Sequence, residues 1–112
     1  MSVRLEWTEP ALADLEALRD YIAQDSPVNA VRFIEWLFKT ADKLVDHPRL
    51  GREVAEADDT SEEIREQIVS GYRILYRVLS DRVQVIAVVD GTRDLAEAKN
   101  KPWNQDPDQA GK

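Results

Sequence analysis

The chain has 112 residues, of which 43% are hydrophobic, with no cysteine and a formal net charge of −7. This size and composition favour one folded domain with a modest core, and they exclude a disulfide framework, thiolate metal sites and a cysteine nucleophile. No apolar run reaches membrane-spanning length and the first residues do not read as a secretory signal, so we expect a cytoplasmic protein with no membrane contact.

The negative charge is concentrated in one stretch. Seven acidic residues and one arginine lie between residues 53 and 66, so this stretch alone carries −6. Such a segment is more typical of a solvated loop than of a metal site, and we expect no metal and no cofactor. The rest of the chain is almost neutral and offers no broad basic field. This argues against direct sequence-specific nucleic-acid binding by the chain alone.

The first half of the chain predicts a strand followed by two helices. Residues 2–7, SVRLEW, alternate apolar and polar side chains as a strand with one covered face does. Thr8 and Ser26 are suitable N-caps, and each is followed by a proline in the first helical turn. Apolar residues recur at helical spacing to about residue 24 and again over 27–45. Because the link is short, the two helices should form an antiparallel hairpin.

The second half predicts a sheet. Three strand-like runs follow the acidic stretch, at residues 63–69, 72–79 and 82–89. Two-residue separators join them, which is the length of a hairpin turn, so the strands form an antiparallel meander. The order is β-α-α-β-β-β and the fold class is α+β, with the helix hairpin packed on one face of an antiparallel sheet.

The end of the chain changes character. We expect the domain to span residues 1–95 and residues 96–112 to form a tail. Asp94 is a suitable cap for a short helix through Lys99, and the composition beyond Asn104 predicts a partly disordered end.

The middle strand of the meander carries two arginines. In residues 70–77, SGYRILYR, Arg73 and Arg77 are four apart, and a strand has a period of two. Their side chains therefore point to the same face, with Leu75 between them. The sequence thus predicts two guanidinium groups on the face that the helices do not cover.

Two interpretations of this face stay open. The candidate residues on or just after the sheet are Arg65, Arg73, Leu75, Arg77 and Arg93. If the face is wet, its arginines are solvated and paired with Glu63 or Glu66. Arginine beside an exposed apolar side chain is, however, typical of a protein-binding surface, and we favour a partner-covered face. Trp103 in the tail is either a further partner anchor or a side chain that packs back on the domain.

The ordered set of segments resembles the RelE/ParE superfamily of bacterial toxins, and more closely its ParE, or plasmid-stabilisation, branch. The matching segments are WTEPALADLEALRDYI (7–22), LVDHPRLGREV (44–54), IREQIVSGYRILYRV (64–78) and VIAVVDGTRD (85–94). The resemblance implies the toxin of a type II toxin–antitoxin module, neutralised by a ParD- or RelB-like antitoxin. ParE-like members are linked to poisoning of DNA gyrase through protein contacts.

RelE-like members of the superfamily cut mRNA in the ribosome instead. By this resemblance, Arg73 and Arg93 fall on two arginines that the nuclease branch uses. Where RelE has two lysines, this chain has Ile64 and Glu66. A site that loses two cations and gains a carboxylate is poorly suited to a polyanionic transition state.

The acid–base group of the nuclease branch is also missing. Near the position of its tyrosine or histidine, the chain has Asp90 and Lys99. We therefore expect a gyrase inhibitor that acts through protein contacts rather than as an enzyme. The alternatives are a ribosome-dependent mRNA endonuclease that uses Arg73 and Arg93, and a detoxified homologue that only binds its antitoxin.

Overall fold

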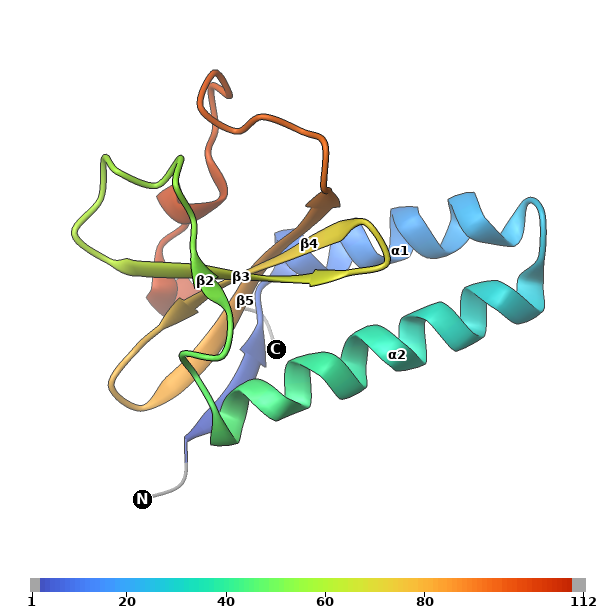
Figure 1. Ribbon diagram of the computed structural model, residues 1–112, viewed down its shortest axis with the longest axis horizontal. Helices are drawn as coiled ribbons and strands as arrows, with labels where there is room; N and C mark the ends of the chain where they lie inside the picture. The colour runs from blue at the N-terminus through green and yellow to red at the C-terminus, as the bar shows by residue number, and fades with distance from the viewer. Residues whose placement is uncertain (1–2, 110–112) are drawn as a thin grey trace.

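The computed structural model describes residues 3–109 and places two helices on one face of a sheet (Figure 1). The elements in chain order are β1 (Arg4–Trp7), α1 (Glu9–Ala23), α2 (Pro27–Asp46), β2 (Arg52–Glu53), β3 (Glu63–Val69), β4 (Tyr72–Val78), β5 (Arg82–Asp90), and two short 3-10 helices, η1 (Pro102–Asn104) and η2 (Pro107–Gln109). No helix within residues 3–109 is long and apolar enough to cross a membrane.

The sheet has five strands in the order β1-β5-β4-β3-β2. β1 runs parallel to β5, and every other neighbouring pair is antiparallel. The predicted α+β class and helix hairpin are confirmed, and the meander is β3-β4-β5. β2 has no counterpart among the predicted strands, because a strand of two residues is too short to produce an alternating pattern.

Both helices begin where the caps predict. The Thr8 hydroxyl accepts a hydrogen bond from the Ala11 N–H at 3.3 Å, and the Ser26 hydroxyl accepts one from the Asn29 N–H at 3.2 Å. The apolar faces of the helices then pack on the sheet. The buried core between the two layers includes Ala11, Leu15, Leu37, Ala41, Leu44, Ile74, Tyr76, Val83, Val85 and Val88.

The β3–β4 turn fixes which side chains face the helices. Ser70 and Gly71 both have positive φ, 48° and 83°, as a two-residue hairpin turn matching the strand twist requires. The resulting register sets Arg65 opposite Tyr76. Because Tyr76 belongs to the core beneath the helices, Arg65 lies on that side, and Arg73 lies on the other. Grouping Arg65 with Arg73 on one face was therefore wrong.

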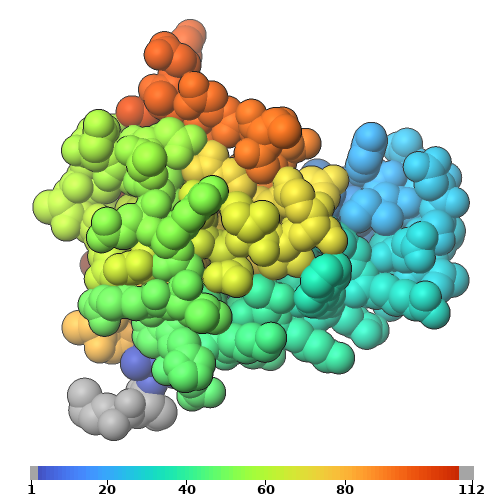
Figure 2. Space-filling view, viewed as in Figure 1, coloured from blue at the N-terminus to red at the C-terminus, as the bar shows by residue number. Residues whose placement is uncertain are grey.

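The sheet face opposite the helices is covered by the chain itself. The loop of residues 54–62 and the tail of residues 95–108 lie over the strands, on the opposite side from α2 (Figures 1 and 2). A second core fills this layer, made of Val54, Ile64, Leu75, Ile86, Ala87, Val89, Leu95 and Trp103. Leu75 and Trp103 are 0% and 3% exposed, so the expectation that they form a surface for a partner was wrong.

Buried cations hold the tail on the sheet. One terminal nitrogen of Arg77 donates to the carbonyl oxygens of Trp103 and Gln105, at 3.1 and 2.8 Å. Arg82 donates to the carbonyl of Pro107 at 2.9 Å. A buried guanidinium needs several acceptors, and carbonyls in and between the two short 3-10 helices of the tail supply them. Arg77 is therefore a structural residue and was wrongly assigned to a partner-binding face.

The tail differs from its predicted form. Residues 94–99 make no helix. Instead, the Asp94 carboxylate accepts the Ala96 N–H at 2.9 Å, a local turn that replaces the first helical hydrogen bonds. Trp103 packs inward and donates from its ring nitrogen to Asp59 at 2.7 Å, so the packing alternative for this residue is correct. Hydrogen bonds between the sheet and the tail continue to Pro107, whose carbonyl accepts from Gln84. The last part of the predicted disordered end, residues 110–112, lies outside the described residues.

The tail packing predicts that Trp103→Ala lowers the free energy of unfolding by about 3 kcal/mol, because it empties a buried aromatic site. Trp36 is 52% exposed and provides a matched control, since Trp36→Ala should cost less than about 1 kcal/mol. Urea unfolding of both variants measures the difference. Equal losses would contradict the buried position of the tail.

Candidate functional site

The structure separates the predicted site residues into three environments. Arg73 and Arg77 are buried on the covered face, with 5% and 0% exposure. Arg65 lies on the helix side of β3, and Arg93 is exposed after β5. Only Arg73 and Arg93 line the same hollow.

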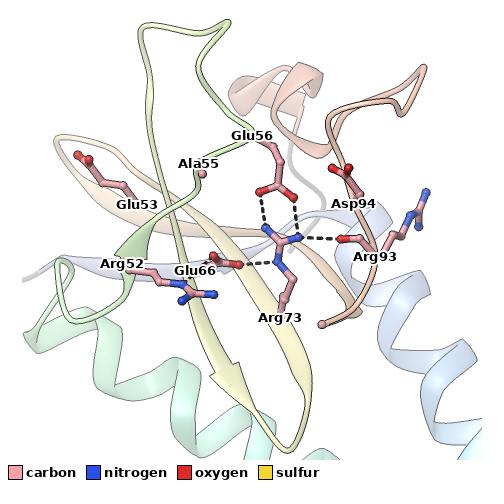
Figure 3. Close-up of a pocket in the computed structure, with 9 residues that line it drawn as sticks. Arg52, Glu53, Ala55, Glu56, Glu66, Arg73, Arg93 and Asp94 are labelled. Atoms are coloured by element: carbon pink, nitrogen blue, oxygen red, sulfur yellow. Dashed lines mark hydrogen bonds and ion pairs between the residues drawn. The ribbon is translucent and has the colours of Figure 1, made fainter.

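Arg73 is the centre of a hydrogen-bonded network (Figure 3). Its two terminal nitrogens each donate to one oxygen of Glu56 at 2.9 Å, and one of them also donates to the Arg93 carbonyl at 3.0 Å. Its Nε donates to Glu66, whose second oxygen accepts from Arg52 at 2.9 Å. Arg73 thereby ties β4 to β3, to the acidic loop and to the segment after β5.

The network controls the charge state of its members. The hydrogen bonds from Arg73 lower the pKa of Glu56 to about 2, although burial opposes the shift. The same bonds to Glu56 raise the pKa of Arg73. A carboxylate in a solvated loop would keep an ordinary pKa, and the pKa of Glu56 departs from it because this loop is held against a buried guanidinium.

A hollow of about 420 Å³ opens beside this network. It is lined by Arg52, Glu53, Ala55, Glu56, Glu66, Arg73, Gly91, Arg93 and Asp94. Three arginines therefore face four acidic residues, and the lining is close to neutral. The hollow does not concentrate the positive charge that binding of a polyanion requires.

Arg93 is the exposed cation of the hollow. Its backbone is held by the turn after β5, where the Arg93 N–H donates to the Asp90 carbonyl at 3.1 Å. The Asp90 carboxylate is occupied in the same turn, because it accepts from both the N–H and the hydroxyl of Thr92. Within the part of the chain that the structure describes, no hydrogen bond or ion pair holds the Arg93 guanidinium.

The remaining arginines have structural partners. The Arg65 Nε donates to Glu63 at 2.6 Å, and this bond raises the pKa of Arg65. The Arg77 Nε lies 3.3 Å from a carboxylate oxygen of Glu62, and burial lowers the pKa of Arg77. Glu63 and Glu66 do pair with Arg65 and Arg73, but the face on which that pairing was placed is not solvated, because Arg73 and Arg77 are buried.

Other chemical groups are sparse around the hollow. Ile64, at a position where the nuclease branch has a lysine, is buried at 4% exposure in the second core. Among residues 3–109, no three His, Asp or Glu side chains are grouped so that they could hold a metal ion. The chemistry available at the hollow is thus that of guanidinium and carboxylate groups.

The sequence analysis missed Glu56 and Arg52 as site residues. Both lie in or beside the acidic stretch that was interpreted as a solvated loop. A usable signal was present, because two inward-facing arginines on one strand need nearby counter-charges. That signal could point to the stretch 53–66, but not to one acid within it.

The Arg73–Glu56 pair predicts a specific dependence of stability on pH. The folded pKa of Glu56, about 2, lies below its ordinary value of 4.5, so the stabilisation is complete above pH 4.5 and is lost as the pH falls toward 2. Glu56→Gln should therefore lower the free energy of unfolding by about 2 kcal/mol at pH 7. The difference in free energy of unfolding between the wild type and Glu56→Gln should be smaller at pH 3 than at pH 7. Urea unfolding at both pH values measures it.

Glu53→Gln is the matched control, because the Glu53 side chain is 78% exposed and has no contact with Arg73 among the bonds described above. Its stability should stay within about 0.5 kcal/mol of the wild type at both pH values. A Glu56→Gln penalty that is the same at pH 3 and pH 7 would contradict the assigned ion pair.

Comparison with known proteins agrees with this fold. Residues 5–95 match the family described as the ParE toxin of the type II toxin–antitoxin system parDE. Toxin RelE2 of Caulobacter vibrioides is 39% identical over 87 residues, which cover 78% of this chain and 93% of that protein.

Two solved structures are similar in fold. The chromosomal ParDE system from P. aeruginosa has a chain with a TM-score of 0.65 at 20% identity, covering 79% of this chain and 95% of that one. A mutant of the E. coli toxin RelE in the free state has a TM-score of 0.54 at 24% identity, covering 82% and 86%. The extent of the family match over the helix hairpin and the meander places the chain in the ParE toxin family, within the RelE/ParE superfamily of type II toxin–antitoxin toxins.

Proposed function

We propose that this toxin acts on DNA gyrase through protein contacts, that it does not cut RNA, and that a cognate antitoxin neutralises it. Membership of the family leaves the target open, because the matching family is named ParE and the similar Caulobacter protein is named RelE2. The proposal therefore rests on the chemistry of the hollow.

The engagement of Arg73 carries the proposal. A guanidinium has five N–H donors, and four of those on Arg73 are directed at Glu56, Glu66 and the Arg93 carbonyl. A phosphate that needs this arginine would have to displace a carboxylate held by two parallel bonds. In this arrangement Arg73 supports the fold and is not available to a scissile phosphate.

The surrounding charge acts in the same direction. A phosphodiester entering the hollow would meet Glu53, Glu66 and Asp94 together with Arg52 and Arg93. A transition state with additional negative charge gains little from a lining that is nearly neutral. Asp90 and Lys99, which stand near the position of the family's acid–base residue, do not line this hollow.

The antitoxin would bind mainly on the helix hairpin, because the chain covers much of its own sheet face. A mostly apolar groove of about 220 Å³ lies between the helices, lined by Leu12, Leu15, Glu16, Arg19, Ile34 and Phe38. An apolar groove beside an antiparallel helix pair fits the apolar face of a partner helix. In this proposal the groove takes the antitoxin, and Arg93 is left to contact the target.

A detoxified homologue is the second candidate function, and the occupied state of Arg73 is the observation that favours it. Such a protein would bind its antitoxin without harming the cell.

Controlled expression in bacteria without the antitoxin tests the proposal, with pulse labelling of DNA and protein synthesis in the same culture. DNA synthesis should fail first. Failure of protein synthesis first, with cleaved transcripts, would establish the nuclease instead. Normal synthesis of both in cells that contain folded protein would establish the detoxified homologue.

Arg93→Ala should weaken toxicity about tenfold without loss of stability, since one charge-assisted contact with the target is worth about 1.4 kcal/mol. Arg4→Ala is the control: its side chain is 61% exposed and it pairs with β5 at Arg82, at the opposite end of that strand from Arg93. The inducer level that stops growth measures the effect. Equal toxicity of the two variants would remove Arg93 from the site.

A further inference from the structure

The Glu56 carboxylate is bound by donors from two other segments of the chain. Arg73 supplies two N–H groups at 2.9 Å, one to each carboxylate oxygen, and the Leu95 backbone N–H supplies a third at 3.2 Å. Two parallel bonds from one guanidinium, with a backbone N–H beside them, form the arrangement that recognises a planar oxyanion.

These donors are positioned without the help of Glu56. Glu66 accepts from the Arg73 Nε, and the Arg93 carbonyl accepts from a terminal nitrogen of the same guanidinium. The Arg73 side chain is 6% exposed, and Leu95 is 1% exposed within the second core. The fork would therefore keep its place and orientation after the Glu56 carboxylate has left.

The Glu56 side chain is more exposed than the groups that bind it. Its backbone belongs to the loop, which is anchored by Val54, 4% exposed, whose N–H donates to the Ile64 carbonyl at 3.0 Å. The Glu56 side chain is 19% exposed and borders the open hollow (Figure 3). Rotation of this side chain into the hollow vacates the donors while Val54 stays in the core.

We propose that the Arg73 fork and the Leu95 N–H form an oxyanion site that Glu56 fills in cis, and that its external ligand is a carboxylate monoanion. Exchange of one carboxylate for another leaves the charge of the site unchanged. A phosphate dianion would add a second negative charge next to Glu66, Glu53 and Asp94. This inference goes beyond the proposed function, because the site stands whichever cellular target the toxin has.

Chemical rescue of Glu56→Ala tests the site. Removing the side chain empties the donors, so 0.2 M sodium formate should raise the melting temperature of this variant by about 4 °C relative to sodium chloride at equal ionic strength. The wild type, whose site is filled, and Glu53→Ala, whose site is also filled, should shift by less than about 1 °C. Phosphate at matched ionic strength should give a smaller rise than formate.

A second readout locates the binding. In Glu56→Ala, formate should move the amide NMR signal of Leu95 in a saturable way, and the wild-type signal should stay in place. Glu56→Asp, whose carboxylate is shorter by one methylene and cannot reach the fork in the same geometry, serves if the alanine variant does not fold.

Two results would overturn the inference. If formate shifts the melting temperatures of Glu56→Ala and Glu53→Ala equally and the Leu95 signal does not move, Arg73 and Glu56 form only a structural ion pair. A larger rise with phosphate than with formate would reject the carboxylate as the ligand.

Discussion

Two guanidinium groups on the central strand β4 determine how the rest of this molecule is arranged. A charge removed from water is tolerated only when it is paired and its donors are satisfied, and a buried unpaired arginine costs several kcal/mol. Arg73 meets this requirement with Glu56 and Glu66. The terminal nitrogens of Arg77 meet it with tail carbonyls and Gln84, while its Nε makes no hydrogen bond within residues 3–109 and lies 3.3 Å from the Glu62 carboxylate. The position of the acidic loop and the path of the tail both follow from this need for acceptors.

The same constraint shapes what the site can do. A buried arginine such as Arg73 can serve a ligand only to the extent that its donors are free. Here two carboxylates occupy the donors of Arg73, and this pairing holds the loop of residues 54–62 against the sheet. Exposed positive charge at the hollow then rests on Arg93 and on Arg52, which is 70% exposed and already bound to Glu66. This distribution of charge is one reason for proposing a protein target in place of RNA.

Local patterns predicted the elements that local physics determines. Capping residues predicted where both helices start, and helical periodicity predicted their buried faces. The Ser70-Gly71 separator predicted the β3–β4 hairpin. Alternation also placed Arg73 and Arg77 on one face. Alternation does not show whether that face is covered, because the covering bonds join residues far apart in the chain. Arg73 and Glu56 are 17 positions apart, and Arg77 and Gln105 are 28.

The same limit explains the other differences. Trp103 reads equally well as an anchor for a partner or for its own domain, because an aromatic residue among prolines carries no sign of what it contacts. Arg65 was grouped with Arg73 because both are arginines. The strand register that places them on opposite faces is fixed by the Ser70-Gly71 turn. Glu56 was one acid among seven, and only the tertiary structure distinguishes the one that Arg73 binds.

The loop of residues 54–62 and the tail of residues 95–108 cover the same sheet face, but the sheet arginines bind them through acceptors of different chemistry. Arg77 and Arg82 bind the tail through its backbone carbonyls, which do not titrate. The loop is bound to Arg73 through one side-chain carboxylate, which can be protonated, rotated out or replaced by another carboxylate. A buried ion network often gives no more stability than apolar side chains of the same volume. The property that we infer for the Arg73–Glu56 pair is that its carboxylate can be exchanged, and this pair borders the hollow where Arg93 is exposed.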